Sequence, residues 1–123
     1  MLETRRASVM YFSEHGLEYD PTKEHAYFHG GIKPSQQAYH VPMFIWYSPT
    51  LGEHVDRQTV NSVFSTAYND YLINTWMGVT RPAQPKTPEE VITRWQGKSV
   101  VFDASHNMFD YKVLRKNFNE TLE

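Results

Sequence analysis

Two short apolar runs, at residues 7–13 and 41–47, dominate the first half of the chain. Both are rich in valine, aromatic and methionine side chains, a composition that is typical of strands. Because the middle of each run is apolar at consecutive positions, we expect two central, parallel strands that are covered on both faces. Pro42 fits only near the start of the second strand or at a sheet edge.

The segment between these runs, residues 16–37, is polar and contains three glycines and two prolines. It is expected to form a long loop with a short helical turn at 22–28. Loops of this length inside a domain are usually functional. A turn at 48–52 is expected to follow the second strand.

Apolar residues recur at helical spacing from 59 to 77, which predicts one long helix with a continuous apolar stripe and Gly78 as its stop. Thr87-Pro-Glu-Glu90 resembles a capping box with proline in the first turn and predicts a short helix through Trp95. Residues 99–103 and 110–115 are expected to form a small strand pair. These elements predict an α/β fold with one domain segment at 1–123.

The composition narrows the class of protein. The chain has 123 residues, 40% of them hydrophobic, and a formal net charge of −2. This is a globular composition with no basic field for nucleic acid. There is no cysteine, which excludes disulfides and thiolate metal ligands. No run approaches the roughly 20 apolar residues of a membrane span, and we expect no signal peptide at the start.

Candidate metal chemistry follows the first strand, where Glu14 and His15 precede Gly16. Adjacent strand residues point to opposite faces, so both side chains can reach one ion only if the strand has ended, and Gly16 permits that turn. A carboxylate and an imidazole suit zinc or manganese better than calcium. The alternative is an acid and a histidine in a solvated loop.

Other histidines are weaker candidates. His25 and His29 would share one face of a helix, although Ala26 stands where a zinc protease has its glutamate. His29 is followed by two glycines that allow close approach of the backbone to a ligand. His40 is expected at a strand edge, and the remaining two, in turns, are expected to be solvated: His54 and His106.

The order of these motifs resembles the C-terminal part of the phosphoethanolamine transferases, which are sulfatase-like members of the alkaline phosphatase superfamily. The resemblance rests on the run Val9 to Gly16, on His29-Gly30 and on His40 to Ser48. A helix that ends near Trp76 and the tail at 109–115 also fit. It covers roughly residues 7–115 and implies a fragment of a three-layer α/β/α sandwich.

In that family the first strand ends in Ser-Asp-His-Gly-Glu, and its Asp and His ligate zinc. The resemblance therefore implies that Glu14 and His15 are metal ligands, and that His29 helps to hold the substrate or a second zinc. His25 is a weaker member of that second group. The family reaction moves phosphoethanolamine from a phospholipid to lipid A, core sugar or another glycan, at the periplasmic face of the bacterial inner membrane.

Two departures from the family pattern bear on function. Glu14 replaces the Asp, and Leu17 replaces the Glu that follows the glycine. The family's threonine nucleophile and membrane spans precede the part that this chain resembles. We therefore expect a truncated segment that is inactive alone, binds zinc weakly and self-associates through its uncovered strand. A segment of a sulfatase or phosphodiesterase, or a non-catalytic relic module, remains an alternative.

Overall fold

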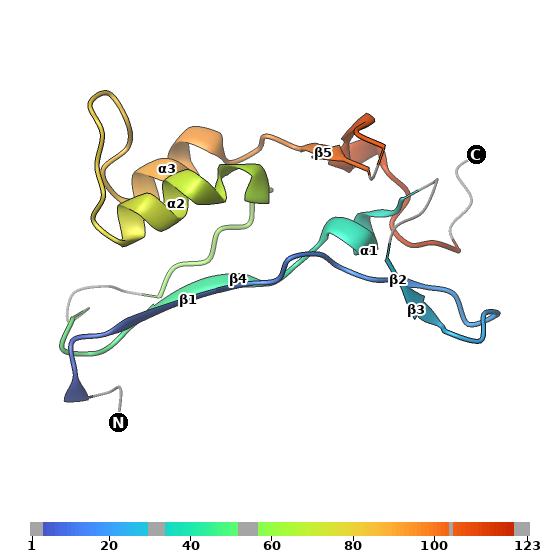
Figure 1. The fold of residues 1–123 in the computed structure, drawn as a ribbon, viewed down its shortest axis with the longest axis horizontal. Coiled ribbons are helices and arrows are strands. Elements are labelled where there is room, and N and C mark those ends of the chain that lie inside the picture. Colours follow the sequence, from blue (N-terminus) through green and yellow to red (C-terminus); the bar gives the residue numbers. More distant parts are fainter. Residues whose placement is uncertain (1–3, 30–33, 52–56, 104, 120–123) are drawn as a thin grey trace. The chain divides into compact units, whose positions relative to one another are not determined.

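The computed structural model describes residues 4–29, 34–51, 57–103 and 105–119 (Figure 1). The chain forms two compact units, one from residues 1–59 with 114–123 and one from residues 60–113. Each unit has its own strand pairing and its own packing. The sequence-predicted sites at 14–29 all belong to the first unit.

The first unit is organised around a two-stranded ribbon of β1 (Ser8–Phe12) and β4 (Met43–Tyr47). The strands are antiparallel, with Met10 opposite Ile45 and Tyr11 opposite Phe44. Strand locations are confirmed, but the parallel arrangement predicted from the sequence is wrong. A parallel return needs a crossover on one face of the sheet. This chain returns instead through a hairpin and one short helix.

That return consists of β2 (Glu18–Tyr19), β3 (Tyr27–Phe28) and α1 (Gln36–Tyr39). The first two pair antiparallel, with Tyr19 opposite Tyr27 and their rings 5.0 Å apart. The helical turn predicted at 22–28 is therefore wrong, because the cross-strand aromatic pair favours a hairpin. The chain end also joins this unit, since Phe118 packs edge-on against Phe28 at 5.2 Å.

The second unit contains a 3-10 turn, Thr66–Tyr68, that leads into α2 (Asn69–Trp76), and then α3 (Pro88–Trp95). The helix predicted over 59–77 thus begins later, because Ser65 caps the chain there by accepting from the N–H of Ala67. It ends as predicted, with Gly78 at a φ of 76°. The N–H of Val79 donates to the carbonyl of Asn74, which completes a Schellman motif.

Helix α3 begins at the predicted cap. The hydroxyl of Thr87 accepts from the N–H of Glu90, and Pro88 occupies the first turn. The Glu90 carboxylate accepts from the N–H of Lys86, one residue before the cap, so the capping box is shifted by one position. Leu72 and Val91 are fully buried, and the ring of Trp95 stacks on Tyr68 at 5.1 Å.

A small hairpin follows, with β5 (Val100–Phe102) antiparallel to β6 (Met108–Asp110), and a 3-10 turn at Tyr111–Val113. The strand predicted at 110–115 therefore begins and ends earlier along the chain than expected. Its turn is fixed by Asp103, which accepts from the backbone of Ser105 and from the backbone and side chain of Asn107. Asp110 similarly accepts from Ser99 at 2.6 Å and ends the second strand.

These hydrogen bonds predict an acid-sensitive hairpin. The Asn107 side chain lowers the pKa of Asp103, and the Ser99 hydroxyl lowers the pKa of Asp110, from an ordinary value of 3.8. A carboxyl group with a lowered folded-state pKa stabilises the fold fully above its unfolded pKa and loses that contribution as the pH falls through the folded pKa. We expect the protection factors of the Asn107 and Lys112 amides, measured against the intrinsic exchange rate at each pH, to fall below about pH 4. Unchanged protection from pH 6 to pH 2.5 would contradict this.

Candidate metal-binding site

The loop from residue 16 to residue 35 places the candidate site, and both of its ends are fixed on the first unit. The N–H of Gly16 donates to the carbonyl of Ala38 at 2.8 Å. A Cβ at position 16 would lie 2.3 Å from the carbonyl oxygen of Gln37. Only glycine therefore allows the segment after β1 to pass this closely under α1.

Two buried carboxylates hold the loop from within. Glu18 is 2% exposed, and its two carboxylate oxygens accept from the N–H and the hydroxyl of Ser35 at 2.7 and 2.6 Å. Asp20 accepts from the hydroxyl and N–H of Thr22, and the hydroxyl is the main cause of its lowered pKa. Sequence analysis did not find these groups. The sequence Asp20-Pro-Thr22 is typical of a turn, so the role of Asp20 could have been predicted. No sequence pattern indicated that Glu18 is buried.

The fixed loop brings His29 back to the end of the first strand. The imidazole rings of His15 and His29 lie 4.7 Å apart between centroids and are tilted by 35°. They come from positions 14 residues apart: His15 lies three residues after the end of β1, and His29 directly follows β3. Of the three residues expected to share one site, Glu14, His15 and His29, the structure thus brings the two imidazoles together, and both of these side chains are exposed.

The hydrogen bond of His15 determines which nitrogen can bind a metal. Its Nδ1 lies 2.8 Å from the carbonyl oxygen of Gly16. A carbonyl only accepts, so Nδ1 carries the proton and a neutral ring leaves Nε2 as the free lone pair. Metal-ligating histidines commonly make this contact with a backbone carbonyl. The arrangement of His15 therefore fits a zinc ligand.

The other sequence candidates do not join this pair to form a shell. Within the described ranges no group of three or more His, Cys, Asp or Glu side chains could hold a metal ion. Glu14 is exposed in the bend after β1, and His25 is exposed in the turn of the β2–β3 hairpin. Residues 22–28 belong to the turn and the second strand of a hairpin. His25 and His29 therefore do not share one face of a helix, as their spacing had predicted. The described residues thus bring two imidazoles together as a candidate site, without a third ligand.

Two further histidines lie in the part of the chain that the structure describes. His40 is the C-cap of α1, next to β4, and His106 occupies the β5–β6 turn with a φ of 62°. His54 falls outside the described residues. His40 and His106 are exposed, as expected for solvated or edge positions.

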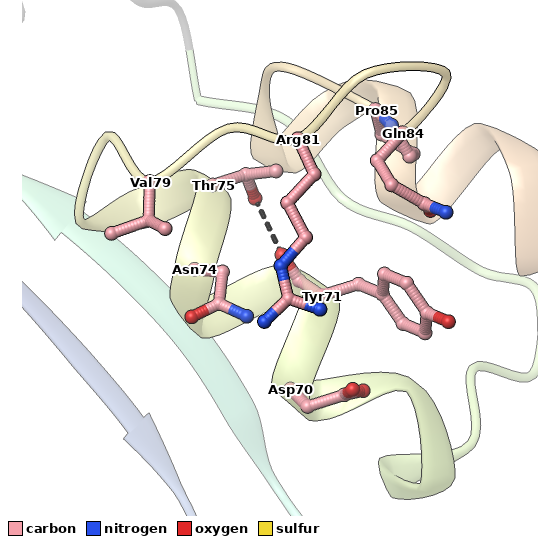
Figure 2. Close-up of a pocket in the computed structure, with 8 residues that line it drawn as sticks. All are labelled: Asp70, Tyr71, Asn74, Thr75, Val79, Arg81, Gln84 and Pro85. Carbon is pink, nitrogen blue, oxygen red and sulfur yellow. Dashed lines mark hydrogen bonds between the residues drawn. The ribbon is translucent and has the colours of Figure 1, made fainter.

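The second unit carries a separate small pocket between α2 and the segment at 79–85 (Figure 2). Its lining combines one carboxylate, one guanidinium and two amides: Asp70, Arg81, Asn74 and Gln84. In Figure 2 the Arg81 side chain points toward α2, while Asp70 lies near the start of that helix. The side chain of Thr75 is turned inward, where its hydroxyl donates to the carbonyls of Tyr71 and Leu72. None of the site residues predicted from the sequence lines this pocket.

The fold and the site define an α/β segment. The imidazole of His15 follows a strand, and the loop after it places the imidazole of His29 beside the first. Comparison with protein families identifies the class, because the sulfatase family model matches residues 2–82. The chain therefore belongs to the sulfatase family. The α/β fold class predicted from the sequence is confirmed by this membership and by the mixed elements of the two units.

Similarity to individual proteins is strong but covers only part of them. The chain is 68% identical over 120 residues to a protein named "Putative transferase YhbX" from Escherichia coli O157:H7, and equally to its counterpart in Escherichia coli strain K12. The match covers 98% of this chain and 22% of either relative. The chain thus spans about a fifth of their length. No solved structure matches it.

No helix within the described ranges has the length and apolar character to cross a membrane.

Proposed function

We propose that this chain is the metal-site segment of a zinc-dependent phosphoethanolamine transferase. The observation that carries the proposal is the contact between His15 and His29 at the strand end of a sulfatase-family chain. The names of the two similar proteins support transfer rather than hydrolysis as the reaction class. The phosphoryl donor and the acceptor are inferred from the family resemblance of the motifs.

In this proposal His15 binds the metal through Nε2, and its Nδ1–H bond to Gly16 keeps the ring in that orientation. Glu14, which is exposed in the bend after β1, would be the carboxylate ligand. His29 binds either a second ion or the phosphoryl group of the substrate. When bound, zinc supplies a Lewis acid that neutralises phosphoryl charge and activates a nucleophile.

The remaining parts belong to the full-length enzyme. A threonine nucleophile and further zinc ligands come from the portion of the longer protein that this chain does not span. Such an enzyme takes phosphoethanolamine from a phospholipid at the periplasmic face of the inner membrane and modifies lipid A, core sugar or another glycan. We expect the 123-residue chain to show no transfer by itself.

A second candidate is a hydrolase of the same family, a sulfatase or a phosphodiesterase. The family model that matches residues 2–82 favours it, because that model describes sulfatases. Both candidates use the same metal ligands, so they differ in the acceptor, which is water in the hydrolase. Release of free phosphoethanolamine by the full-length relative, without transfer to a glycan, would favour the hydrolase.

We predict weak zinc binding by the isolated chain, because two or three ligands cannot complete a tetrahedral shell. Half of the free energy of a complete structural site is about 5–8 kcal/mol, which corresponds to a Kd between roughly micromolar and submillimolar. Calorimetry at neutral pH tests this. His15→Ala and His29→Ala should each weaken binding about tenfold or more, and Glu14→Asp should strengthen it.

The matched control is His106→Asn, which removes an imidazole from the other unit and keeps a residue that tolerates its positive φ. Its zinc affinity should equal that of the unmodified chain. Equal affinity in the His15→Ala and His106→Asn variants would reject the site. A tight, stoichiometric site would contradict the proposal that other ligands lie outside this chain.

A further inference from the structure

The segment at residues 115–118, called the C-terminal segment below, follows the second unit along the chain but belongs to the first unit. It lies beyond residue 82, where the match to the sulfatase family model ends. It makes backbone hydrogen bonds with α1 and a ring contact with the β2–β3 hairpin. Each of these two elements is directly connected to one histidine of the candidate site.

The first contact is between the C-terminal segment and the start of α1. The N–H of Gln36 donates to the carbonyl of Arg115 at 2.8 Å, and the next N–H along the helix donates to the carbonyl of Lys116 at 3.1 Å. The first N–H groups of a helix have no partner within the helix and need one from elsewhere. The side chain of Ser35, the N-cap residue, does not supply it, because its hydroxyl donates to a buried carboxylate. The C-terminal segment therefore satisfies the start of α1.

The other end of α1 holds the residue that follows His15. The carbonyl of Ala38 accepts from the N–H of Gly16 at 2.8 Å. The carbonyl of Gly16 in turn accepts from Nδ1 of His15 at 2.8 Å. A continuous series of hydrogen-bonded groups thus runs from the C-terminal segment through α1 to the imidazole of His15.

The second contact is between aromatic rings and reaches the other histidine. The ring of Phe118 meets Phe28 edge-on at 5.2 Å, and the ammonium group of Lys23 lies 3.9 Å from the centre of the Phe28 ring. The guanidinium of Arg115 lies 4.7 Å over the Phe118 ring and donates to the Phe118 carbonyl at 2.7 Å, which holds this ring in place. Phe28 is the last residue of β3 and directly precedes His29.

We infer that the C-terminal segment positions His15 and His29 against each other, with Phe118 as the positioning residue on the side of His29. The two imidazoles follow different elements, so their separation of 4.7 Å depends on how the hairpin lies against α1. The C-terminal segment contacts both elements and so fixes that arrangement. What the imidazoles bind is given by the proposed function, on which this role rests, whereas the ring contact itself belongs to the metal-free chain.

Removal of the Phe118 ring tests this role in the metal-free chain. The imidazoles of His15 and His29 lie close enough for a nuclear Overhauser effect between their ring protons, and Phe118→Ala should abolish it. Phe118→Tyr keeps the ring and should retain the signal. Phe44→Ala is the matched control, because it removes the same side chain from a stacked pair in the same unit and should leave the signal unchanged.

Cross-strand signals between β1 and β4 show whether each variant is folded. Phe118→Leu is the milder variant, because it keeps most of the apolar volume and removes the ring edge that meets Phe28. In a folded Phe118→Leu chain the signal between the two imidazoles should be weakened. An imidazole contact that persists at full strength in both Phe118→Ala and Phe118→Leu would overturn the inference. Equal loss of this contact in Phe44→Ala would overturn it as well.

Zinc titration by calorimetry on the same samples separates this role from the proposed function. Phe118→Ala should bind zinc about tenfold more weakly than the unmodified chain, and Phe118→Tyr should bind it equally well. If the unmodified chain binds no zinc, the proposed function fails, while loss of the imidazole contact in Phe118→Ala still supports the positioning role. Zinc affinity that Phe118→Ala leaves unchanged, in a chain that binds zinc, would overturn that role.

Discussion

Replacing Leu72 with alanine is expected to lower the free energy of unfolding of the second unit by about 3 kcal/mol. Leu72 on α2 and Val91 on α3 are both fully buried, and the two helices are in contact with each other. The two helices otherwise meet through aromatic rings, in which Tyr71 and Trp95 lie 4.6 Å apart. The substitution therefore removes a fully buried aliphatic side chain from a small core and leaves a cavity there.

Urea unfolding followed by far-UV circular dichroism tests this prediction. The control is Val60→Ala in the same unit, where the side chain is 47% exposed and the cost should be below about 0.5 kcal/mol. All variants must be compared at one protein concentration, because association would add to the apparent stability. A loss for Leu72→Ala no larger than that of Val60→Ala would show that α2 and α3 do not form a stable core.

Strong local signals in the sequence predicted the positions of several elements. The apolar runs marked β1 and β4, and Gly78 and Thr87 marked the end of α2 and the start of α3. Each of these signals acts within a few residues, through side-chain alternation or a cap. These signals predicted the element positions correctly because they depend only on neighbouring residues.

Pairing and boundaries were harder to predict because they depend on contacts between distant residues. The antiparallel order of β1 and β4 is set by the path of the loop between them, which the two apolar runs do not encode. The β2–β3 hairpin has strands of two residues, which are too short to show alternation. The start of α2 was misplaced because the apolar spacing continues into residues before Ser65 that do not form a helix.

In the candidate site, too, local motifs were predicted from the sequence and contacts between distant residues were not. Glu14, His15 and His29 were identified from motif order, and the structure places the last two in contact. The groups that hold them there were missed, because Glu18 and Ser35 are separated by 17 positions and neither residue type suggests burial. A buried carboxylate satisfied by one distant serine is a property of the fold rather than of a motif.

Gly16 connects the site to the fold, and Gly16→Ala is expected to disrupt both. The added methyl would lie 2.3 Å from the carbonyl oxygen of Gln37 and 2.8 Å from that of Ala38, and both are backbone atoms. Relief therefore requires a shift of α1 or of the segment that carries His15, and the hydrogen bond from Gly16 to Ala38 is lost or lengthened. Overpacking of this kind costs about 1–3 kcal/mol.

The expected result of Gly16→Ala is thus a destabilised first unit together with zinc binding at least about tenfold weaker, because His15 moves away from His29. Leu17→Ala is the matched control, since that neighbouring side chain is 42% exposed and its loss should change neither quantity. Nuclear magnetic resonance shifts of the two imidazoles, with calorimetry on the same samples, measure both effects. Unchanged stability and unchanged zinc affinity in Gly16→Ala would mean that α1 does not pack against residue 16, and that the loop does not position the two histidines.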